Sequence, residues 1–480
     1  MCSDLKNCTP AHDVDVDQSA GRSESRSEGS TRLANLSASE NALDFLVSPS
    51  PRLSKAVRLN ALVAHPWLAF ALIFFVSFGM RFAILMKIPQ AQLGSGGEAS
   101  HIAETLIAKR QYADPFAVPT GPTAHLTPFY PVLLSGMKII FGSGSTGGLA
   151  QSLFVIAAYS LLYALYPRFA SGFGFPVSAG ILAGLLSALL PVKRATEVFR
   201  GWEEPYAAIT LAFLLGFTLR CWQKRDERYR TALLLGASWG LALYVSATLA
   251  SILIGLLAVD IAYRRSWRGC RNALLVILGA AVVIAPWIIR NRVALGGWTF
   301  MRTGLGQNLR CSNHDGVYAS IELINAHSDL KQMYALNSAA ESRNIRSMGE
   351  LAYDRHQREL AFEWIRWHPG RFALLSAQRC LYFWGGPQEH SFELLVTSAY
   401  TILGLCGLAL MRRRVGALVF RMWCTTLATY PVVYYFVQYA PRYRVAIDWM
   451  IWLSAGLAVA VVLEQIKWKP APHRSNSEIA

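Results

Sequence analysis

The chain has 480 residues, of which 53% are hydrophobic and only 16% are charged, and its formal net charge is +16. This composition excludes an ordinary soluble protein, because several apolar runs reach the ~20 residues that a helix needs to cross a bilayer core. The basic residues gather in short loops between those runs, as the cytoplasmic bias of Lys and Arg requires. The positive charge therefore indicates membrane topology, with anionic lipid or phosphate as further partners, and argues against nucleic-acid binding.

The two ends of the chain are polar. Residues 1–60 have no apolar periodicity and are rich in Ser, Asp, Arg and Asn, which predicts a disordered cytoplasmic tail. They contain no signal-peptide pattern. Residues 61–465 form the predicted multi-pass domain, and residues 466–480 a second cytoplasmic tail, so both termini are expected in the cytoplasm.

Ten apolar runs are predicted to cross the membrane: residues 66–86, 148–166, 175–190, 206–219, a pair within 231–262, 272–288, 394–410, 415–434 and 447–463. The pair follows from charge, because the basic segments 220–230 and 263–271 are both predicted to be cytoplasmic. An even number of crossings must therefore separate them, and we expect the pair to break near 244–248.

Two long outer loops are predicted between these spans, and the short turns 192–205 and 438–444 are also predicted to lie outside. The first, residues 87–147, holds an amphipathic helix and the apolar piece 126–141, which is too short and proline-rich for a full span and is predicted to be re-entrant. The second is the large loop 289–393, in which the amphipathic run 350–372 is predicted to be a helix on the membrane surface. Cys311 and Cys380 fall in this loop. They could form a bridge, but two free thiols are favoured.

Acidic candidates come from two outer turns. Glu98 opens the first-loop helix, where a carboxylate complements the helix dipole but could also act as a general base. Glu203 and Glu204 precede a span whose proline makes an acidic start structurally useful, and a supporting role in a site is equally open. His125 could cap or pack a turn or contribute to a site, and Tyr130 is a further candidate in the re-entrant piece.

Basic candidates lie at the outer ends of spans, against the charge bias, and therefore need an explanation. They could anchor the chain at the interface. We favour phosphate binding, because a guanidinium holds phosphate through two parallel hydrogen bonds. No second His or carboxylate stands at ligand spacing, so no metal site is visible and no cofactor is predicted, although a divalent metal stays open. The basic candidates are Arg290, Arg292, Arg302, Arg442 and Arg444.

An ordered set of segments resembles a known family. The acidic residue that opens the short helix is followed by PTGPTAHLTPFYPVLLSGMKIIFG, GWEEPYAAITLAFLL, APWIIRNRVALGGWTFMRTGLGQNL, ELAFEWIRWHPGRFALLSAQRCLYFW and APRYRVAIDWMIWL. Together they resemble bacterial C-fold (GT-C) glycosyltransferases that use polyprenyl-phosphate sugars, a family 39-like group related to protein O-mannosyltransferases and aminoarabinose transferases. The resemblance implies Glu98 as catalytic base, Glu203 or Glu204 as a supporting acid, and arginines on the donor phosphate.

The expected protein is therefore an all-α, GT-C-like bundle of about ten transmembrane helices with a re-entrant segment and an outer-face loop region. The resemblance implies an inverting hexosyltransferase of the bacterial inner membrane. It would move a sugar from a polyprenyl phosphate to a lipid, glycan or protein acceptor on the outer face. The alternative is a transporter, or a flippase or export subunit for lipid-linked glycans, but those place ionisable groups near mid-membrane.

Overall fold

The computed structural model describes residues 65–89, 93, 97–190, 197–199, 201–225 and 228–467. The predicted N-terminal tail lies outside these ranges, as do residues 468–480 of the predicted C-terminal tail. Within the described ranges the chain is helical, and its extended segments pair only in two isolated bridges, Ala113 with Pro122 and Ser320 with Tyr439.

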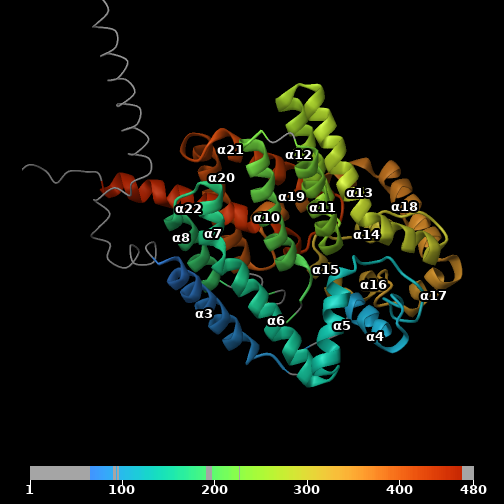
Figure 1. The fold of residues 1–480 in the computed structure, drawn as a ribbon. Coiled ribbons are helices and arrows are strands. Elements are labelled where there is room, and N and C mark those ends of the chain that lie inside the picture. Colours follow the sequence, from blue (N-terminus) through green and yellow to red (C-terminus); the bar gives the residue numbers. More distant parts are fainter. Residues whose placement is uncertain are drawn as a thin grey trace, which may run out of the picture. The chain divides into compact units, whose positions relative to one another are not determined.

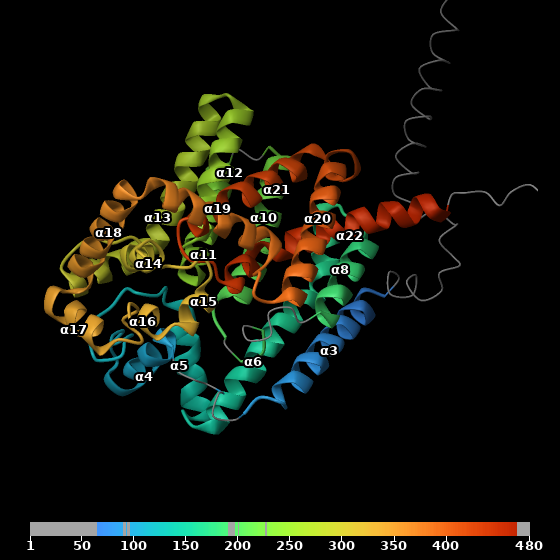
Figure 2. The same cartoon turned by 180° about the vertical axis from the view of Figure 1, so that it is seen from behind.

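The first half of the chain contains the helices α3 (Pro66–Leu85), α4 (Glu98–Lys109), α5 (Phe129–Phe141), α6 (Ser145–Ala164), α7 (Tyr166–Phe173), α8 (Val177–Leu189), α10 (Glu204–Gln223), α11 (Tyr229–Val245), α12 (Leu249–Arg264) and α13 (Trp267–Leu295). The second half contains α14 (Leu305–Ser312), α15 (Ile321–Ala326), α16 (Ser328–Lys331), α17 (Ala339–Met348), α18 (Glu350–Trp367), α19 (Pro369–Gly385), α20 (Ser391–Arg414), α21 (Ala417–Thr429), the 3₁₀ turns η3 (Tyr430–Tyr435) and η4 (Pro441–Arg444), and α22 (Val445–Lys467). Figures 1 and 2 show them from opposite sides.

Among the described residues, six helical segments are long and apolar enough to cross a membrane: α3, α6 with α7, α10, α13, α20 and η4 with α22. The expected ten spans are not confirmed. The other four predicted crossings fall on α8, α11, α12 and α21, which have 13, 17, 16 and 13 residues. At ~1.5 Å per residue these helices are shorter than the ~30 Å hydrocarbon core of a bilayer.

Two local predictions meet different outcomes. The predicted break within residues 231–262 is confirmed, because α11 ends at Val245 and α12 begins at Leu249. The single surface helix predicted for residues 350–372 is wrong. The chain turns at His368, and Pro369 starts α19 at a position where proline needs no helical hydrogen bond.

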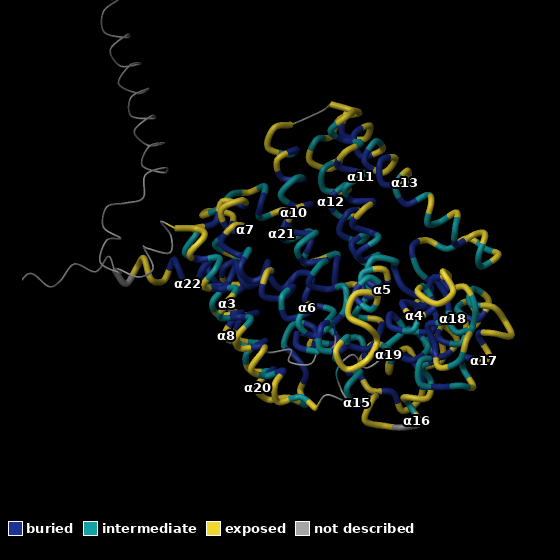
Figure 3. Tube along the Cα trace, turned by 60° about the horizontal axis from the view of Figure 1, so that its bottom comes forward, coloured by how far each residue is buried: buried dark blue, intermediate teal, exposed yellow. Residues whose placement is uncertain are grey.

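The helix α22 is the centre of the bundle. In its most apolar 18-residue stretch 89% of the residues are buried, whereas the figure for α3 is 28%. The helix α22 is therefore enclosed by protein, and α3 leaves most of its surface exposed. It packs against α20, α8 and α10, and it is mainly dark blue in Figure 3. Trp449 of this helix meets Trp423 of α21 edge-on, with ring centroids 5.5 Å apart. A buried, aromatic-rich helix thus holds the surrounding helices in register.

Glycines allow the closest helix pairs to meet backbone to backbone. A Cβ at Gly407 of α20 would overlap the carbonyl oxygen of Ser454 in α22, and one at Gly236 of α11 would overlap that of Val276 in α13. Membrane helices associate largely through such close packing of small residues.

Replacing either glycine by alanine should therefore force two helices apart. We expect Gly407→Ala and Gly236→Ala each to destabilise the protein by about 1–3 kcal/mol, as overpacking does. Thermal unfolding in detergent, followed by tryptophan fluorescence, measures this change. Gly79→Ala in α3 is the control, because a Cβ there meets no atom within 4 Å. Equal effects at all three positions would contradict the packing argument.

Candidate active site

The loop that follows α4 is held in place by charged side chains from distant parts of the chain. Arg290, near the end of α13, donates from Nη1 to the carbonyl oxygen of Thr123 (2.5 Å) and from Nη2 to that of Tyr112 (2.8 Å). Glu350, the first residue of α18, accepts from the backbone N–H of Ala124 at 2.9 Å. Backbone groups in a loop without regular structure need such partners when they leave water. Arg290, which we expected on a donor phosphate, thus uses two nitrogens to shape this loop.

The loop brings His125 to Glu98. The Nε2 atom of His125 lies 3.8 Å from Oε1 of Glu98 at the first residue of α4. The ring of His125 is fixed on its other sides by Phe116, edge-on at 4.8 Å between centroids, and by Gly304, where a Cβ would come 2.9 Å from the imidazole. Gly304 has a φ of +89°, so glycine suits both the backbone and the contact.

The electrostatics of this pair favour an ionised carboxylate. Burial opposes ionisation of Glu98, but the hydrogen-bonding and charge of His125, together with the positive charge of Arg442, leave the pKa of Glu98 below its ordinary value. A carboxylate that is charged and still one-fifth exposed can accept a proton from a bound molecule.

A second set of side chains, Trp202, Glu204 and Arg442, lies near the start of α4, and Arg442 comes from near the end of the chain. The guanidinium of Arg442 lies 4.0 Å from the ring centroid of Trp202, and its Nη1 is 3.5 Å from Oε1 of Glu204. Trp202 also faces the backbone before Glu98, because a Cβ at Gly97 would lie 3.7 Å from the indole. The indole therefore contacts both the start of α4 and the arginine, and it orients that arginine by a cation–π contact.

Tyr130 joins this group, because its ring stacks on Trp202 with centroids 6.4 Å apart. Glu203 lies half-buried just before α10. The structure thus gathers Glu98, His125, Tyr130, Glu204 and Arg442 from three outer turns of the predicted topology.

Other groups at this cluster were not found from the sequence. Trp202 adjoins the two acids in GWEEP, but nothing in the motif shows that its ring would carry an arginine from the last turn. Glu350 is one acid among many in an amphipathic helix. Its role depends on contacts with a loop 226 residues away in the sequence.

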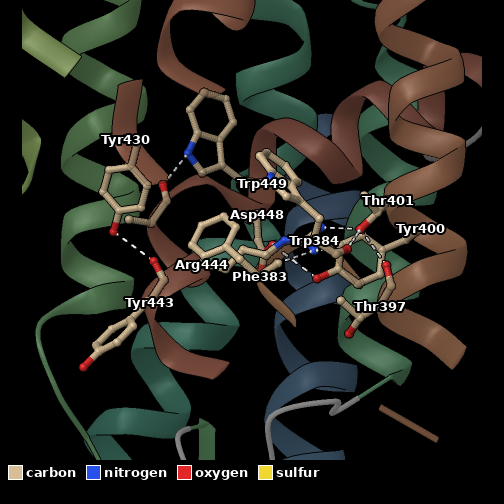
Figure 4. Close-up of polar contacts among 11 residues, drawn as sticks. Phe383, Trp384, Thr397, Tyr400, Thr401, Tyr430, Tyr443, Arg444, Asp448 and Trp449 are labelled. Atoms are coloured by element: carbon tan, nitrogen blue, oxygen red, sulfur yellow. Dashed lines mark hydrogen bonds and ion pairs between the residues drawn. The ribbon is translucent and has the colours of Figure 1, made fainter. Parts of the chain in front are cut away.

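The two arginines of the turn η4 face opposite ways, although we expected both on a donor phosphate. In a 3₁₀ helix residues two apart are rotated by about 240°. Arg442 contacts the cluster, whereas Arg444 is fully buried in the helix bundle. Figure 4 shows Arg444 among its polar partners. The partners of Arg444 are the carbonyl oxygens of Phe383 (3.1 Å) and Trp384 (2.8 Å), the hydroxyl of Thr401 (2.6 Å) and the carboxylate of Asp448 (2.6 Å).

The remaining candidates lie apart from these contacts. Arg292 is exposed, with its guanidinium 5.9 Å from the ring of Trp298. Arg302 donates from Nε to the neighbouring carbonyl of Thr303 at 3.4 Å. Cys311 and Cys380 are both free thiols. Within the described ranges, no three His, Cys, Asp or Glu side chains converge as metal ligands would.

No protein-family model matches this sequence, and no curated protein matches it. The fold, however, is similar to that of the oligosaccharyltransferase AglB of the archaeon Archaeoglobus fulgidus. The chain superposes on the complex of that enzyme with an inhibitory peptide and a dolichol-phosphate with a TM-score of 0.50 at 14% identity, covering 84% of this chain and 50% of that one. The apo form of the Archaeoglobus fulgidus oligosaccharyltransferase gives 0.50 at 13% identity, with 84% and 51% covered.

These likenesses define the fold. The archaeal enzyme is a GT-C glycosyltransferase, so the structure has the GT-C fold that the ordered sequence segments resemble. This chain spans about half of the length of the archaeal chains it matches.

The opposite orientations of the η4 arginines can be tested by stability. Arg444→Lys removes forked hydrogen bonds from several buried acceptors, each of which costs about 1–3 kcal/mol when left unpaired, so we expect a loss of about 2–4 kcal/mol. Arg442→Lys keeps a cation beside Glu204 and Trp202 and should cost less than about 1 kcal/mol. Chemical unfolding in detergent measures both losses. Equal losses would show that the two side chains have similar environments.

Proposed function

We propose that this protein is a membrane glycosyltransferase that transfers a sugar from a polyprenyl-phosphate donor to an acceptor on the outer face of the membrane. The observation that carries the proposal is the cluster of an ionised carboxylate, Glu98, with an arginine, Arg442, in a chain with the GT-C fold. The archaeal neighbour of similar fold was seen with a dolichol-phosphate, which supports a lipid phosphate as the donor group here.

The chemistry would be a single displacement at the anomeric carbon. The acceptor hydroxyl or amine attacks that carbon while Glu98 takes its proton, and the bond between the carbon and the phosphate oxygen breaks with its electron pair on the phosphate. Arg442 would stabilise the charge that develops on the departing phosphate. One displacement inverts the anomeric configuration, and Glu98 must lose its proton before the next cycle.

The neighbours of these two groups have supporting roles in this proposal. Glu204 and Trp202 hold the guanidinium of Arg442 from two sides, so it needs little reorganisation when phosphate arrives. His125 holds the carboxylate of Glu98 towards the loop and favours its charged form. Phosphate contact is proposed for Arg442, whereas Arg290 and Arg444 would act by holding the backbone around the site.

The decisive experiment is mass spectrometry of lipids that co-purify with the protein, combined with a transfer assay on the lipid recovered. Glu98→Gln should still carry a polyprenyl-phosphate sugar but should lose about 10²- to 10⁴-fold in turnover, the range of a general base. Glu104→Gln is the matched control on the same helix, because Glu104 is half-exposed and pairs with Lys138 at 2.9 Å. Full turnover in Glu98→Gln, or lipid movement without transfer, would favour a transporter.

The pH dependence tests the pair of His125 and Glu98. Glu98 acts as a base only when it is ionised, and His125 lowers its pKa. In His125→Gln the effect of burial is opposed only by a backbone hydrogen bond and by the charge of Arg442, so the pKa of Glu98 should rise and the acid limb of kcat/KM should move to higher pH. A pH profile of the wild type and the variant measures this shift. An unmoved acid limb, or one moved to lower pH, would exclude Glu98 as the titrating base.

A further inference from the structure

A tyrosine of the large outer loop lies beside the Glu98 site and has no part in the contacts described above. Tyr334 follows α16, and the residues on both sides of it contact two other segments, α14 and the first outer loop. The thiol of Cys311 in α14 lies 3.4 Å from the carbonyl oxygen of Met333. The backbone N–H of Ala117, in the first outer loop, donates to the carbonyl oxygen of Ala335 at 3.3 Å.

A chain of packed side chains connects this segment to the reactive carboxylate. Ala335 is fully buried in a cluster with Phe116, whose ring meets His125, and His125 in turn contacts Glu98. Burial raises the pKa of Tyr334 well above its ordinary value, and the nearby Cys311, Tyr443 and Glu98 raise it further. The phenol is therefore a neutral hydrogen-bond donor at the edge of the site.

The hydroxyl of Tyr334 is shielded from solvent and has no hydrogen-bond partner among the described residues. A buried hydroxyl without a partner is unfavourable, because it has lost its bonds to water. Tyr353 in the same region shows the usual arrangement, since its hydroxyl donates to the carboxylate of Glu341 at 2.5 Å. The missing hydrogen bond of a hydroxyl beside a site is explained if a bound molecule supplies the partner.

We propose that the hydroxyl of Tyr334 binds substrate, by donating a hydrogen bond to an oxygen of the sugar that the lipid donor carries to Glu98. This inference rests on the proposed glycosyltransferase function. The sugar is favoured over the phosphate because Arg379, whose charge acts on Tyr334, already uses Nη1 and Nη2 to donate to Asn313 and to the carbonyls of Ser312 and Phe436. The phosphate is assigned to Arg442, which lies against Trp202 and Glu204.

The test compares Tyr334→Phe with Tyr353→Phe, each made in the full chain that also carries Glu98→Gln, so that bound donor is not consumed. Mass spectrometry of co-purified lipids gives the ratio of sugar-bearing to sugar-free polyprenyl phosphate. We expect this ratio to fall about threefold to tenfold in Tyr334→Phe, the loss of one hydrogen bond, with total polyprenyl phosphate unchanged. In Tyr353→Phe the ratio should stay that of the parent.

Thermal unfolding without added lipid separates this role from a structural one. Tyr334→Phe removes a hydroxyl that lacks an internal partner, so its melting temperature should equal or exceed that of the parent. Tyr353→Phe removes the hydrogen bond to Glu341, so this variant should melt at a lower temperature than the parent. The inference is overturned by an unchanged lipid ratio in Tyr334→Phe, by equal loss of both lipid forms, or by a melting temperature as low as that of Tyr353→Phe. A parent protein that carries no polyprenyl phosphate would instead overturn the proposed function.

Discussion

The burial of Arg444 is the constraint on which the candidate site depends. Its guanidinium joins the end of α19, the middle of α20 and the first turn of α22, so that three segments far apart in the sequence meet at one side chain. A buried guanidinium is costly unless its charge and donors are paired. Here Nη1 and Nη2 of Arg444 donate to two backbone carbonyls and a hydroxyl, and Nε forms an ion pair with the carboxylate of Asp448. Because Arg444 is held in this way, the 3₁₀ turn before α22 has one orientation, and that orientation directs Arg442 towards Trp202 and Glu204.

The same principle governs the first outer loop. Its backbone leaves regular structure between α4 and α5, and its carbonyl and N–H groups are paired with Arg290 and Glu350. These two residues come from the end of α13 and the start of α18, so the loop has its shape only in the assembled bundle. His125 and Phe116 lie in this loop, so the geometry at Glu98 depends on the contacts that Arg290 and Glu350 make with the loop backbone.

Fold and function have separate support. The GT-C fold is given by the likeness to the archaeal oligosaccharyltransferase, at 14% identity and over half of the length of that enzyme. That likeness brings no sugar, acceptor or catalytic residue to this chain. The proposed chemistry comes from the residues themselves, because Glu98, whose pKa is lowered by His125 and Arg442, lies near an arginine that Glu204 and Trp202 orient. Transfer of a sugar from a lipid phosphate needs a base for the acceptor and an anion-binding group for the departing phosphate.

The sequence by itself determined the membrane class, the apolar helices and the break between α11 and α12, and it gave the candidate acids and arginines in the predicted outer turns. These features follow from hydropathy, charge bias and proline or glycine position, which are local properties of the chain. The tertiary structure decided which arginine faces the site, because Arg442 and Arg444 have the same local sequence signal and differ only in what packs around them. It also decided the contacts of Trp202 and Glu350 and the surroundings of Tyr334. A side chain's partner hundreds of residues away is set by the packing of the whole bundle and cannot be predicted from its neighbours along the chain.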